Sequence, residues 1–322
     1  MMVKKAIMGV LLALSSVLLS SCGRRVGTQN PSQAAQVRDF PMVEVPSMMS
    51  GETERMEYAV SRYWNAFTDT AKVYSCDSVT VNGVPLDDVE AAMGMYVRLL
   101  QMVPADKAVA AVDGFYSRID AFERSRPGTN VFEELVRLTS KYLYDANSPV
   151  RDEQLYLPFV SRLGESDLID NGYRMGYEWD ARMCALNLPG TPAADFSFTD
   201  TRGKVQTLYG IRSEKTLLIF GNPGCAACLE LMRQMDSNPH VSAQIADGSL
   251  KVVDIYIDEE VSEWKAHTGE YPKSWINGYD HGGVIRRDLI YNVRAIPSLY
   301  LLDSRKIVIL KDAPADRVLS LL

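Results

Sequence analysis

The sequence is poor in the residues and patterns that several common functions require. It has three histidines in 322 residues, and none lies between residues 52 and 187, so that stretch offers no histidine-based catalytic constellation. Lysine and arginine number 34 against 41 acids, which leaves no basic footprint for nucleic acid. An apolar run near the N-terminus ends after residue 19 and is too short for a membrane span of about 20 residues. The chain also lacks repeats and low-complexity tracts. We therefore expect neither a nucleic-acid partner nor a transmembrane helix.

The N-terminus carries a targeting pattern. Lys4 and Lys5 precede the apolar run, which continues into Leu19-Ser20-Ser21-Cys22. This pattern resembles a bacterial lipoprotein signal, and the resemblance implies cleavage before Cys22 and lipidation of that cysteine. An ordinary secretory signal with an incidental cysteine is the alternative, and either signal exports the protein. No acidic stretch resembling a surface-export signal follows Cys22, so we expect a lipid-anchored envelope protein that faces the periplasm.

The length predicts two domains. Residues 1–21 contain two lysines and no acids, so the remaining chain has 32 basic and 41 acidic residues. Its size exceeds that of a usual single domain, and the 47% apolar content can fill two cores. A polar segment with three prolines, residues 22–51, reads as a flexible tether. We divide the rest at the Pro189-Gly190 turn, into residues 52–187 and 188–322.

Residues 52–187 are predicted to be all-α. Apolar side chains recur there at intervals of three and four, which is typical of helices that pack one face into a core rather than of a docking groove. Asn130 followed by Glu133 has the spacing of a capping box, and Pro158 is expected to kink its helix or to delay its start. The last helix is expected from about Gly172 to Leu186.

Residues 188–322 are predicted to be an α/β domain with a central mixed sheet flanked by helices. A hairpin is expected over residues 195–203, and β-branched or apolar runs predict buried strands. A helix follows the first buried strand, and a short helix closes the chain. The predicted strands after the hairpin are Thr216–Phe220, Val252–Ile257, Ser298–Leu302 and Lys306–Leu310.

One constellation carries chemistry, namely Cys225-Ala-Ala-Cys228 at the start of the helix after the Thr216–Phe220 strand. A thiolate at a helix N-terminus meets free backbone N–H groups and the positive end of the dipole, which lowers its pKa. Cys228, three residues on, lies within disulfide reach. Cys225 can then attack a substrate disulfide, and Cys228 can resolve the mixed disulfide.

Two other uses of the pair are open. A zinc site would need further ligands from His240, His267, His281, Cys76 and Cys184, and none has a convincing ligand spacing. We therefore expect no metal. A permanently oxidised structural disulfide is the stronger alternative in an exported protein.

A second motif, Ala295-Ile296-Pro297-Ser298, stands immediately before the Ser298–Leu302 strand. With it, residues 188–322 resemble the thioredoxin superfamily and are most similar to TlpA-like membrane-anchored thioredoxins. The resemblance implies that Cys225 is the nucleophile and Cys228 the resolving thiol. It also implies that Pro297 is cis and that Ile296 and Pro297 form the edge that binds a substrate peptide by strand addition. No cofactor is implied beyond the redox-active Cys225–Cys228 disulfide.

The sequence departs from this family at two informative positions. Gly224 stands where a tryptophan often precedes the first cysteine, and Ile219 stands where many thioredoxins have a buried acid. Glu230 and Asp254 are the acids that could handle protons instead. Ala226-Ala227 lacks the histidine of strongly oxidising members, which favours reduction or isomerisation.

Three further segments carry weaker expectations. Tyr142–Pro149, together with the thioredoxin part, resembles an uncharacterised two-domain lipoprotein family that implies no substrate. Lys273–Asp280 is expected either to form a rim over the active site or to pack as an ordinary loop. Cys76 and Cys184 could close a disulfide across the helical domain, although buried free thiols are the favoured state.

These features predict an extracytoplasmic thiol–disulfide oxidoreductase, reductase or isomerase-like. Its expected partners are protein or peptide thiols and disulfides in the envelope, an unidentified electron donor or acceptor, and the membrane that holds the anchor. The alternative is a non-catalytic envelope binding module, in which a fixed Cys225–Cys228 disulfide braces a thioredoxin-like fold.

Overall fold

The computed structural model describes residues 37–74 and 76–322. Residues 36–322 form one compact unit. The predicted signal segment and Cys22 lie outside the described residues. Within the described residues, no helix combines the length and the apolar character needed to cross a membrane.

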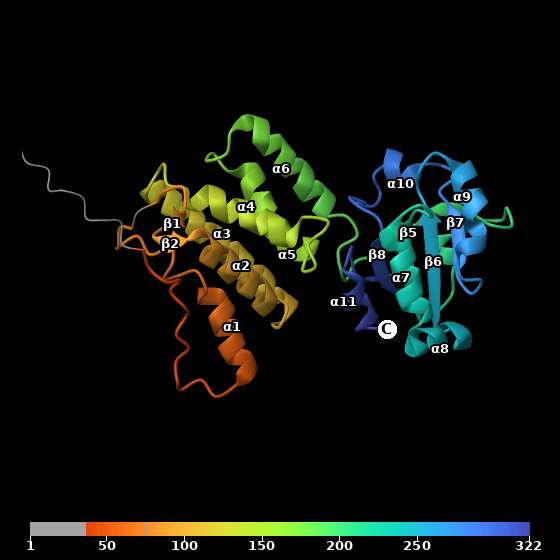
Figure 1. The fold of residues 1–322 in the computed structure, drawn as a ribbon, viewed down its shortest axis with the longest axis horizontal. Coiled ribbons are helices and arrows are strands. Elements are labelled where there is room, and N and C mark those ends of the chain that lie inside the picture. The colour runs from red at the N-terminus through yellow and green to blue at the C-terminus, as the bar shows by residue number, and fades with distance from the viewer. Residues whose placement is uncertain (1–36, 75) are drawn as a thin grey trace, which may run out of the picture. The chain divides into compact units, whose positions relative to one another are not determined.

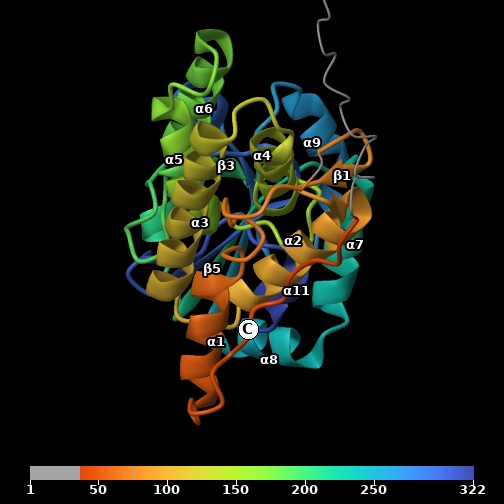
Figure 2. The ribbon, with the colours of Figure 1, turned by 90° about the vertical axis from the view of Figure 1, so that its left-hand side faces the viewer.

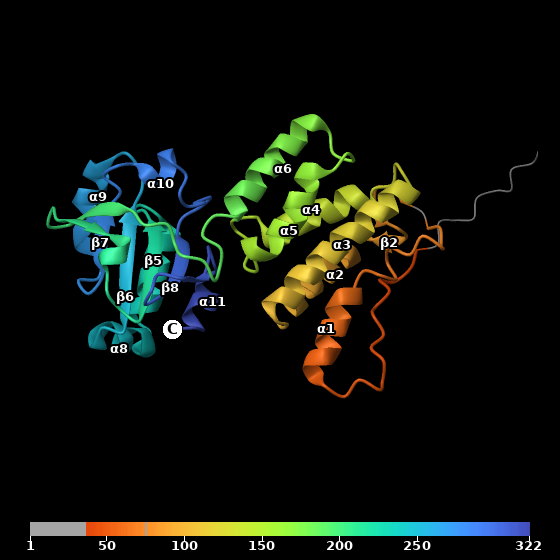
Figure 3. The ribbon, with the colours of Figure 1, turned by 180° about the vertical axis from the view of Figure 1, so that it is seen from behind.

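The first part of this unit is a helical module. Its helix α3 packs against α1, α4 and α5, while α5 and α6 run side by side, as Figures 2 and 3 show. The helices, labelled in Figure 1, are α1 (Glu52–Arg62), α2 (Leu86–Leu100), α3 (Ala105–Ser125), α4 (Val131–Leu143), α5 (Glu153–Glu165) and α6 (Asn171–Cys184).

The apolar stripes predicted from the sequence form the core of this module. Tyr63, Trp64 and Phe67, at the end of α1 and just after it, are buried against Tyr96 of α2 and Phe115 of α3. Trp64 lies 5.0 Å from Phe115 and 5.8 Å from Tyr96 between ring centroids. The prediction that these aromatic side chains pack internally is confirmed.

The module is not all-α, because a small hairpin precedes α2. Strands β1 (Thr80–Val81) and β2 (Val84–Pro85) pair in antiparallel register. Asn82 and Gly83 join them with positive φ angles of 49° and 80°, the backbone that an Asn-Gly hairpin turn requires. Asn82-Gly83 is a recognisable hairpin signal in the sequence. The prediction missed it because the sequence on both sides has helical periodicity.

Three local expectations need correction. Part of the predicted tether is anchored: Arg38 Nε donates to the Asn82 carbonyl (2.9 Å), and Phe40 packs on the aromatic core. Asn130 makes no side-chain cap on α4, because its amide instead donates to the carbonyls of Asp77 and Thr80 at 2.9 Å. Of the two outcomes expected for Pro158, the late helix start is wrong, because α5 begins at Glu153 with Asp152 as its capping residue and contains Pro158.

The second part contains a seven-stranded mixed sheet. From one edge to the other, its strands lie in the order β4-β3-β7-β6-β5-β8-β9. The pairs β5–β6 and β6–β7 are parallel, whereas β8 lies antiparallel to β5. The strands are β3 (Ser197–Asp200), β4 (Val205–Thr207), β5 (Lys215–Gly221), β6 (Leu250–Tyr256), β7 (Ile276–Tyr279), β8 (Ser298–Asp303) and β9 (Val308–Leu310).

Alternate residues of the central strand β5 serve two cores, one on each face of the sheet. Leu217 and Ile219 pack with α7 (Ala226–Asp236), α8 (Pro239–Asp247) and α11 (Ala315–Leu319). Leu218 and Phe220 pack on the other face, the side of α10 (Val284–Arg287). Helix α7 crosses in front of the sheet in Figure 1. The prediction of a mixed sheet flanked by helices is therefore confirmed for residues 188–322.

The segment Lys273–Asp280 is neither a rim nor a loop. It contains β7, which lies between β6 and β3 in the sheet. Trp275, Asn277 and Gly278 are buried. A Cβ atom at Gly278 would stand 2.5 Å from Cδ2 of Phe198, so glycine is what allows the neighbouring strand to approach.

Candidate active site

Cys225 lies where β5 passes into α7. The strand ends at Gly221, a short turn follows, and Cys225 becomes the N-cap of α7 with an extended backbone (φ −88°, ψ 117°). Its Sγ accepts a hydrogen bond from the backbone N–H of Cys228 at 3.3 Å. The sulfur therefore lies at the end of α7 where the backbone N–H groups of the first turn have no helical carbonyl partner.

Cys228 has a different environment one turn further into the helix. Only 4% of its surface is exposed, whereas Cys225 is partly exposed. Burial, with Cys225 as the next cause, raises the pKa of the Cys228 thiol well above its ordinary value. Both are free thiols in this structure.

The turn before β8 stands opposite the cysteines. The Ile296–Pro297 peptide bond is cis, as the sequence predicts. The Ile296 carbonyl oxygen lies 3.6 Å from Cys225 Sγ, within hydrogen-bond range for sulfur. The structure thus brings together Cys225, Cys228, Ile296 and Pro297, although Cys225 and Ile296 are 71 positions apart in sequence.

The two candidate acids occupy contrasting positions. Asp254 lies on β6 opposite Ile219 of β5 and is 2% exposed. Burial raises its pKa to about 7, and its charge raises the pKa of Cys228. Glu230 lies on the exposed side of α7, where its carboxylate pairs with Arg233 at 3.1 Å. Only Asp254 has the burial that makes a carboxyl group exchange protons near neutral pH.

Residues around Asp254 were not anticipated from the sequence. Asn277 of β7 is the register partner of Asp254, and its Oδ1 accepts a hydrogen bond from Trp264 Nε1 at 2.7 Å. Trp264 belongs to α9 (Val261–His267) and is buried. Tyr271, also buried, has its pKa raised mainly by burial and then by the charge of Asp254. The acid is therefore buried near Asn277 and Tyr271 and away from bulk water.

A second unanticipated feature is a buried ionic cluster behind the Ile296–Pro297 turn. Glu153, the first residue of α5, accepts ion pairs from Lys311 Nζ (2.7 Å) and Arg294 Nε (3.0 Å). Arg294 also reaches Asp312, at 3.1 Å, and donates to the Tyr144 carbonyl. The side chains of Glu153 and Lys311 are 1% and 2% exposed. The helical module therefore contacts the turn that faces Cys225 through charges that water does not screen.

The same cluster extends to the ends of the turn. Asn292 Nδ2 donates to Glu153 at 2.9 Å, and Ser298 Oγ donates to Asp312 at 2.7 Å. Arg151, which precedes α5, donates to the Asp312 carbonyl at 3.0 Å. No local sequence pattern signals these contacts, because the paired residues lie as far as 161 positions apart.

Cys184 adjoins the ionic cluster, because its carbonyl oxygen accepts a hydrogen bond from Lys311 Nζ at 2.7 Å. Cys184 is fully buried, and burial raises its pKa well above the ordinary value. Cys76 is partly buried, and neither forms a disulfide in this structure. His267 Nδ1 pairs with Glu270 at 2.7 Å, and His281 is exposed with its ring 3.2 Å from Thr199 Oγ1.

Comparisons with known proteins cover both parts of the chain. A family model described as a domain of unknown function (DUF5106) matches residues 20–179. A crystal structure of a thioredoxin-like protein from Bacteroides caccae is 31% identical, covers 89% of this chain and 98% of its own, and gives a TM-score of 0.76. No curated protein matches the chain.

Two further structures each match less than half of this chain. The C-terminal domain of an uncharacterized protein from Bacteroides fragilis is 45% identical over 42% of this chain and 97% of its own, with a TM-score of 0.41. A thiol:disulfide interchange protein from a Bacteroides species is 18% identical over 42% of this chain and 88% of its own, with a TM-score of 0.35.

Proposed function

This chain belongs to the same family as the thioredoxin-like protein of Bacteroides caccae, and from that premise we propose that it is an extracytoplasmic thiol–disulfide oxidoreductase of the TlpA-like kind. The observation that carries the proposal is the asymmetry of the Cys225–Cys228 pair. Cys225 is accessible, caps α7 and lies 3.6 Å from the Ile296 carbonyl, while Cys228 is buried behind it. A bond that only braced the fold would not require one accessible sulfur beside an open peptide edge.

The first step uses Cys225 as the nucleophile. Its thiolate attacks one sulfur of a substrate disulfide, a new bond forms between Cys225 Sγ and that sulfur, and the second substrate sulfur leaves as a thiolate. The start of α7 holds the attacking sulfur next to the backbone N–H of Cys228, which donates a hydrogen bond to it. The backbone of Ile296 offers the substrate main chain a hydrogen-bonding edge next to the reacting sulfur.

The second step uses Cys228 and Asp254. Cys228 must lose its proton before it can attack Cys225 Sγ, and burial disfavours the free thiolate. Asp254, rather than the exposed Glu230, is the acid that takes this proton, because it is buried within electrostatic reach of Cys228. The Cys225–Cys228 bond then forms, and the first substrate sulfur leaves as a thiolate. The substrate gains two electrons that the protein dithiol loses.

A complete cycle needs a dithiol donor that reduces the Cys225–Cys228 disulfide again. We propose that a reducing protein in the envelope supplies these electrons. In the isomerase-like variant, the substrate's own thiol attacks the mixed disulfide and no net electrons are needed. The side chains of Ala226 and Ala227, between the two cysteines, are small, uncharged and exposed. They leave room for the backbone of a protein substrate to approach Cys225.

The proposed location is the cell envelope, with Cys22 lipidated and the folded part facing the periplasm. The sequence pattern ending in Leu19-Ser20-Ser21-Cys22 supports this proposal. A disulfide-exchanging protein is useful only where disulfides persist, and the periplasm is such a compartment.

Two measurements on the full-length chain test the proposal. The reduced protein should reduce a small-molecule disulfide stoichiometrically, and equilibration with glutathione should give a reduction potential well above that of a structural bond. Structural disulfides have potentials below about −300 mV. A lower value, together with no exchange, would favour the non-catalytic binding module.

A further inference from the structure

Two cavities adjoin the loop that connects α4 to α5, residues 144–152. One cavity of about 310 Å³ lies beside the active site and is lined by Ala227, Ile296 and Pro297 together with Ala146 and Asn147 of the loop. The other, of about 600 Å³, lies within the helical module and also has Asn147 in its wall. The loop therefore separates the edge that faces Cys225 from a second, larger pocket.

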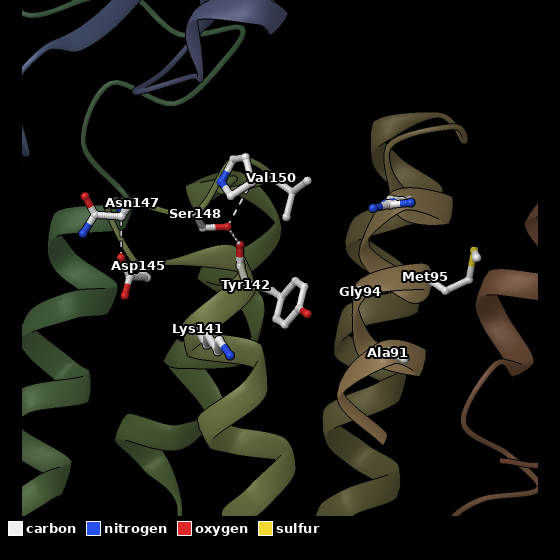
Figure 4. A pocket seen from close by; sticks show the side chains of 11 residues that line it. Ala91, Gly94, Met95, Lys141, Tyr142, Asp145, Asn147, Ser148 and Val150 are labelled. Atoms are coloured by element: carbon white, nitrogen blue, oxygen red, sulfur yellow. Dashed lines mark hydrogen bonds between the residues drawn. The ribbon is translucent and has the colours of Figure 1, made fainter. Parts of the chain in front are cut away.

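The larger pocket has a defined shape, shown in Figure 4. Ala91, Gly94 and Met95 of α2 form one wall, and Tyr142 of α4 points toward them from the other. A Cβ atom at Gly94 would stand 3.1 Å from Cε1 of Tyr142, so glycine allows the ring to approach. At about 600 Å³, the cavity is within the usual range of about 300–1,000 Å³ for ligand pockets.

Hydrogen bonds hold the loop in place at several points. Ser148 Oγ donates to the Tyr142 carbonyl at 2.6 Å, and the Asn147 N–H donates to Asp145 Oδ1 at 2.8 Å, as drawn in Figure 4. Gln101 Nε2 donates to the Val150 carbonyl at 3.3 Å. At its two ends, the buried charges of Arg294 and Glu153 fix the loop to the turn beside Cys225. A bound chain would meet two pockets whose separation is already set, which lowers the entropy lost on binding.

The chemistry of the larger pocket selects its occupant. Its walls are largely apolar, with Met95 45% exposed. Three charged residues line it: Lys141 pairs with Glu90, and Asp145 accepts the Asn147 N–H. The Arg98 guanidinium makes no hydrogen bond or ion pair among residues 37–74 and 76–322. An apolar side chain would remove Met95 and its neighbours from water, and an adjacent carboxylate would pair with Arg98.

We propose that this pocket is a second binding site for the disulfide substrate, and that it takes an apolar side chain flanked by an acidic residue in the same extended polypeptide whose cysteine reaches Cys225. The chain passes over Ala146 and Asn147 from one cavity to the other. This inference rests on the proposed function and adds the substrate class to it: a polypeptide with an apolar–acidic anchor at some distance from its cysteine. The helical module thereby selects the substrate.

A pool of synthetic peptides tests the proposal on the full-length Cys228→Ala protein. Each peptide contains one cysteine activated as a mixed disulfide with thionitrobenzoate, plus either a Phe-Glu anchor or a Ser-Gln pair, at spacings up to about ten residues on either side. Cys225 attacks the peptide sulfur, the Cys225–peptide bond forms, and thionitrobenzoate leaves with the electron pair. Mass spectrometry of the adducts at Cys225 then reports which peptides were selected.

Anchored peptides should be enriched at least about tenfold over Ser-Gln peptides, the factor expected from burial of one large apolar side chain. The enrichment should peak at one spacing, because the two cavities are fixed relative to each other. Equal trapping of both sets at every spacing would overturn the proposal, as would selective binding of dodecanoate in place of the peptides.

Matched variants separate the pocket from general effects. Ala91→Trp fills the pocket from an exposed helical position and should abolish the enrichment, while Arg98→Gln should remove only the preference for glutamate. Ala110→Trp is the control, since Ala110 is also an exposed helical alanine but lines a different cavity with Gly114 and Tyr58. Both tryptophan variants should release thionitrobenzoate from Ser-Gln peptides at the wild-type rate. Undiminished enrichment in Ala91→Trp would overturn the assignment.

Failure of the redox function would look different. In that case, Cys225 would release no thionitrobenzoate from any peptide, and the pocket would be tested by fluorescence anisotropy of an anchored peptide with serine in place of cysteine. Binding that Ala91→Trp weakens and Ala110→Trp leaves intact would support the pocket. Absence of binding to the wild-type chain would overturn it.

Discussion

Gly221, the last residue of β5, lies directly against the carboxyl group of Asp254 on β6: a Cβ atom at Gly221 would stand 3.0 Å from Asp254 Oδ2. The other oxygen, Oδ1, is buried without a hydrogen-bond partner. Ile219, two residues earlier on β5, faces the apolar core instead. The buried acid therefore lies on β6, next to the β5 position where many thioredoxins have it, and Gly221 leaves space for its carboxyl group.

Asp254→Asn should change how stability depends on pH. The pKa of Asp254 rises from 3.8 to about 7 on folding, so the folded state holds a proton that the unfolded state loses between these values. Stability therefore falls as the pH rises from about 4 to about 7, by up to about 4 kcal/mol. Urea unfolding of the wild type should show this loss, and the asparagine variant should lack it.

The same variant should slow the second chemical step. Without a proton acceptor beside Cys228, the decay of the mixed disulfide should be at least about tenfold slower near pH 7, in line with the usual contribution of general acid–base groups. The attack of Cys225 should keep its wild-type rate. Glu230→Gln is the control, and an equal effect of that exposed substitution would remove Asp254 from its assigned role.

Glu153→Gln should destabilise the protein and weaken catalysis together. The substitution leaves the buried Lys311 without its counter-charge and leaves Arg294 with Asp312 as its remaining acidic partner. Breaking a buried pair in this way costs about 3–5 kcal/mol. Arg294 would then hold the turn before Pro297 less firmly. Thermal unfolding and kcat/KM for a peptide disulfide are the measurements.

A second substitution separates charge from packing. Lys311→Met in the Glu153→Gln background removes the buried charge that Glu153→Gln leaves unpaired and should recover part of the lost stability. Exposed ion pairs such as Arg137–Glu134 contribute little, so Glu134→Gln is the matched control. A double variant no more stable than Glu153→Gln alone would argue against an electrostatic cause.

The placement of the cysteine pair at the start of a helix could be predicted because its signals are local. A buried strand, a short turn and two cysteines three residues apart fix the geometry of Cys225 and Cys228 within a dozen residues. The Ile296–Pro297 turn also stands next to a strongly apolar strand. Family resemblance then supplied the long-range pairing of this turn with Cys225, which periodicity does not provide.

What escaped prediction depends on distant contacts. The β7 sequence contains Asn277 and Gly278, which are poor strand formers, and only the Phe198 ring across the sheet explains why glycine is needed. Glu153 reads as an ordinary acid at a helix start, yet its partners Arg294 and Lys311 lie more than a hundred positions away. Tertiary context overrides local propensity in both cases.

The four cysteines within the described residues should differ in reactivity toward iodoacetamide. Cys225 should react first, because it is partly exposed at the start of α7. Cys184 should react only after unfolding, because it is fully buried and burial raises the pKa of its thiol. Mass spectrometry after timed alkylation of the reduced protein gives the order. A Cys184 that reacts as fast as Cys225 would contradict the described packing.

Cys22 should be the first residue of the mature protein and should carry acyl chains. Each buried methylene contributes about 0.8 kcal/mol to anchoring, so more than one chain is needed for stable attachment. Mass analysis of the mature N-terminus checks the prediction, and Cys22→Ser should release the protein from membranes. A mature N-terminus at any other residue, without lipid, would end the lipoprotein assignment.

Cys228→Ala should stall the reaction at the mixed disulfide. Cys225 can still attack, but the thiol that breaks the resulting bond is missing, so substrate proteins should accumulate covalently on the variant and be released by dithiothreitol. Cys225→Ala should trap nothing, because the remaining thiol is buried and its pKa is raised. Non-reducing gels of oxidised envelope extracts distinguish the two variants. Equal trapping by both, or trapping by neither while the wild type leaves a small-molecule disulfide intact, would exclude the proposed division of labour and favour the binding module.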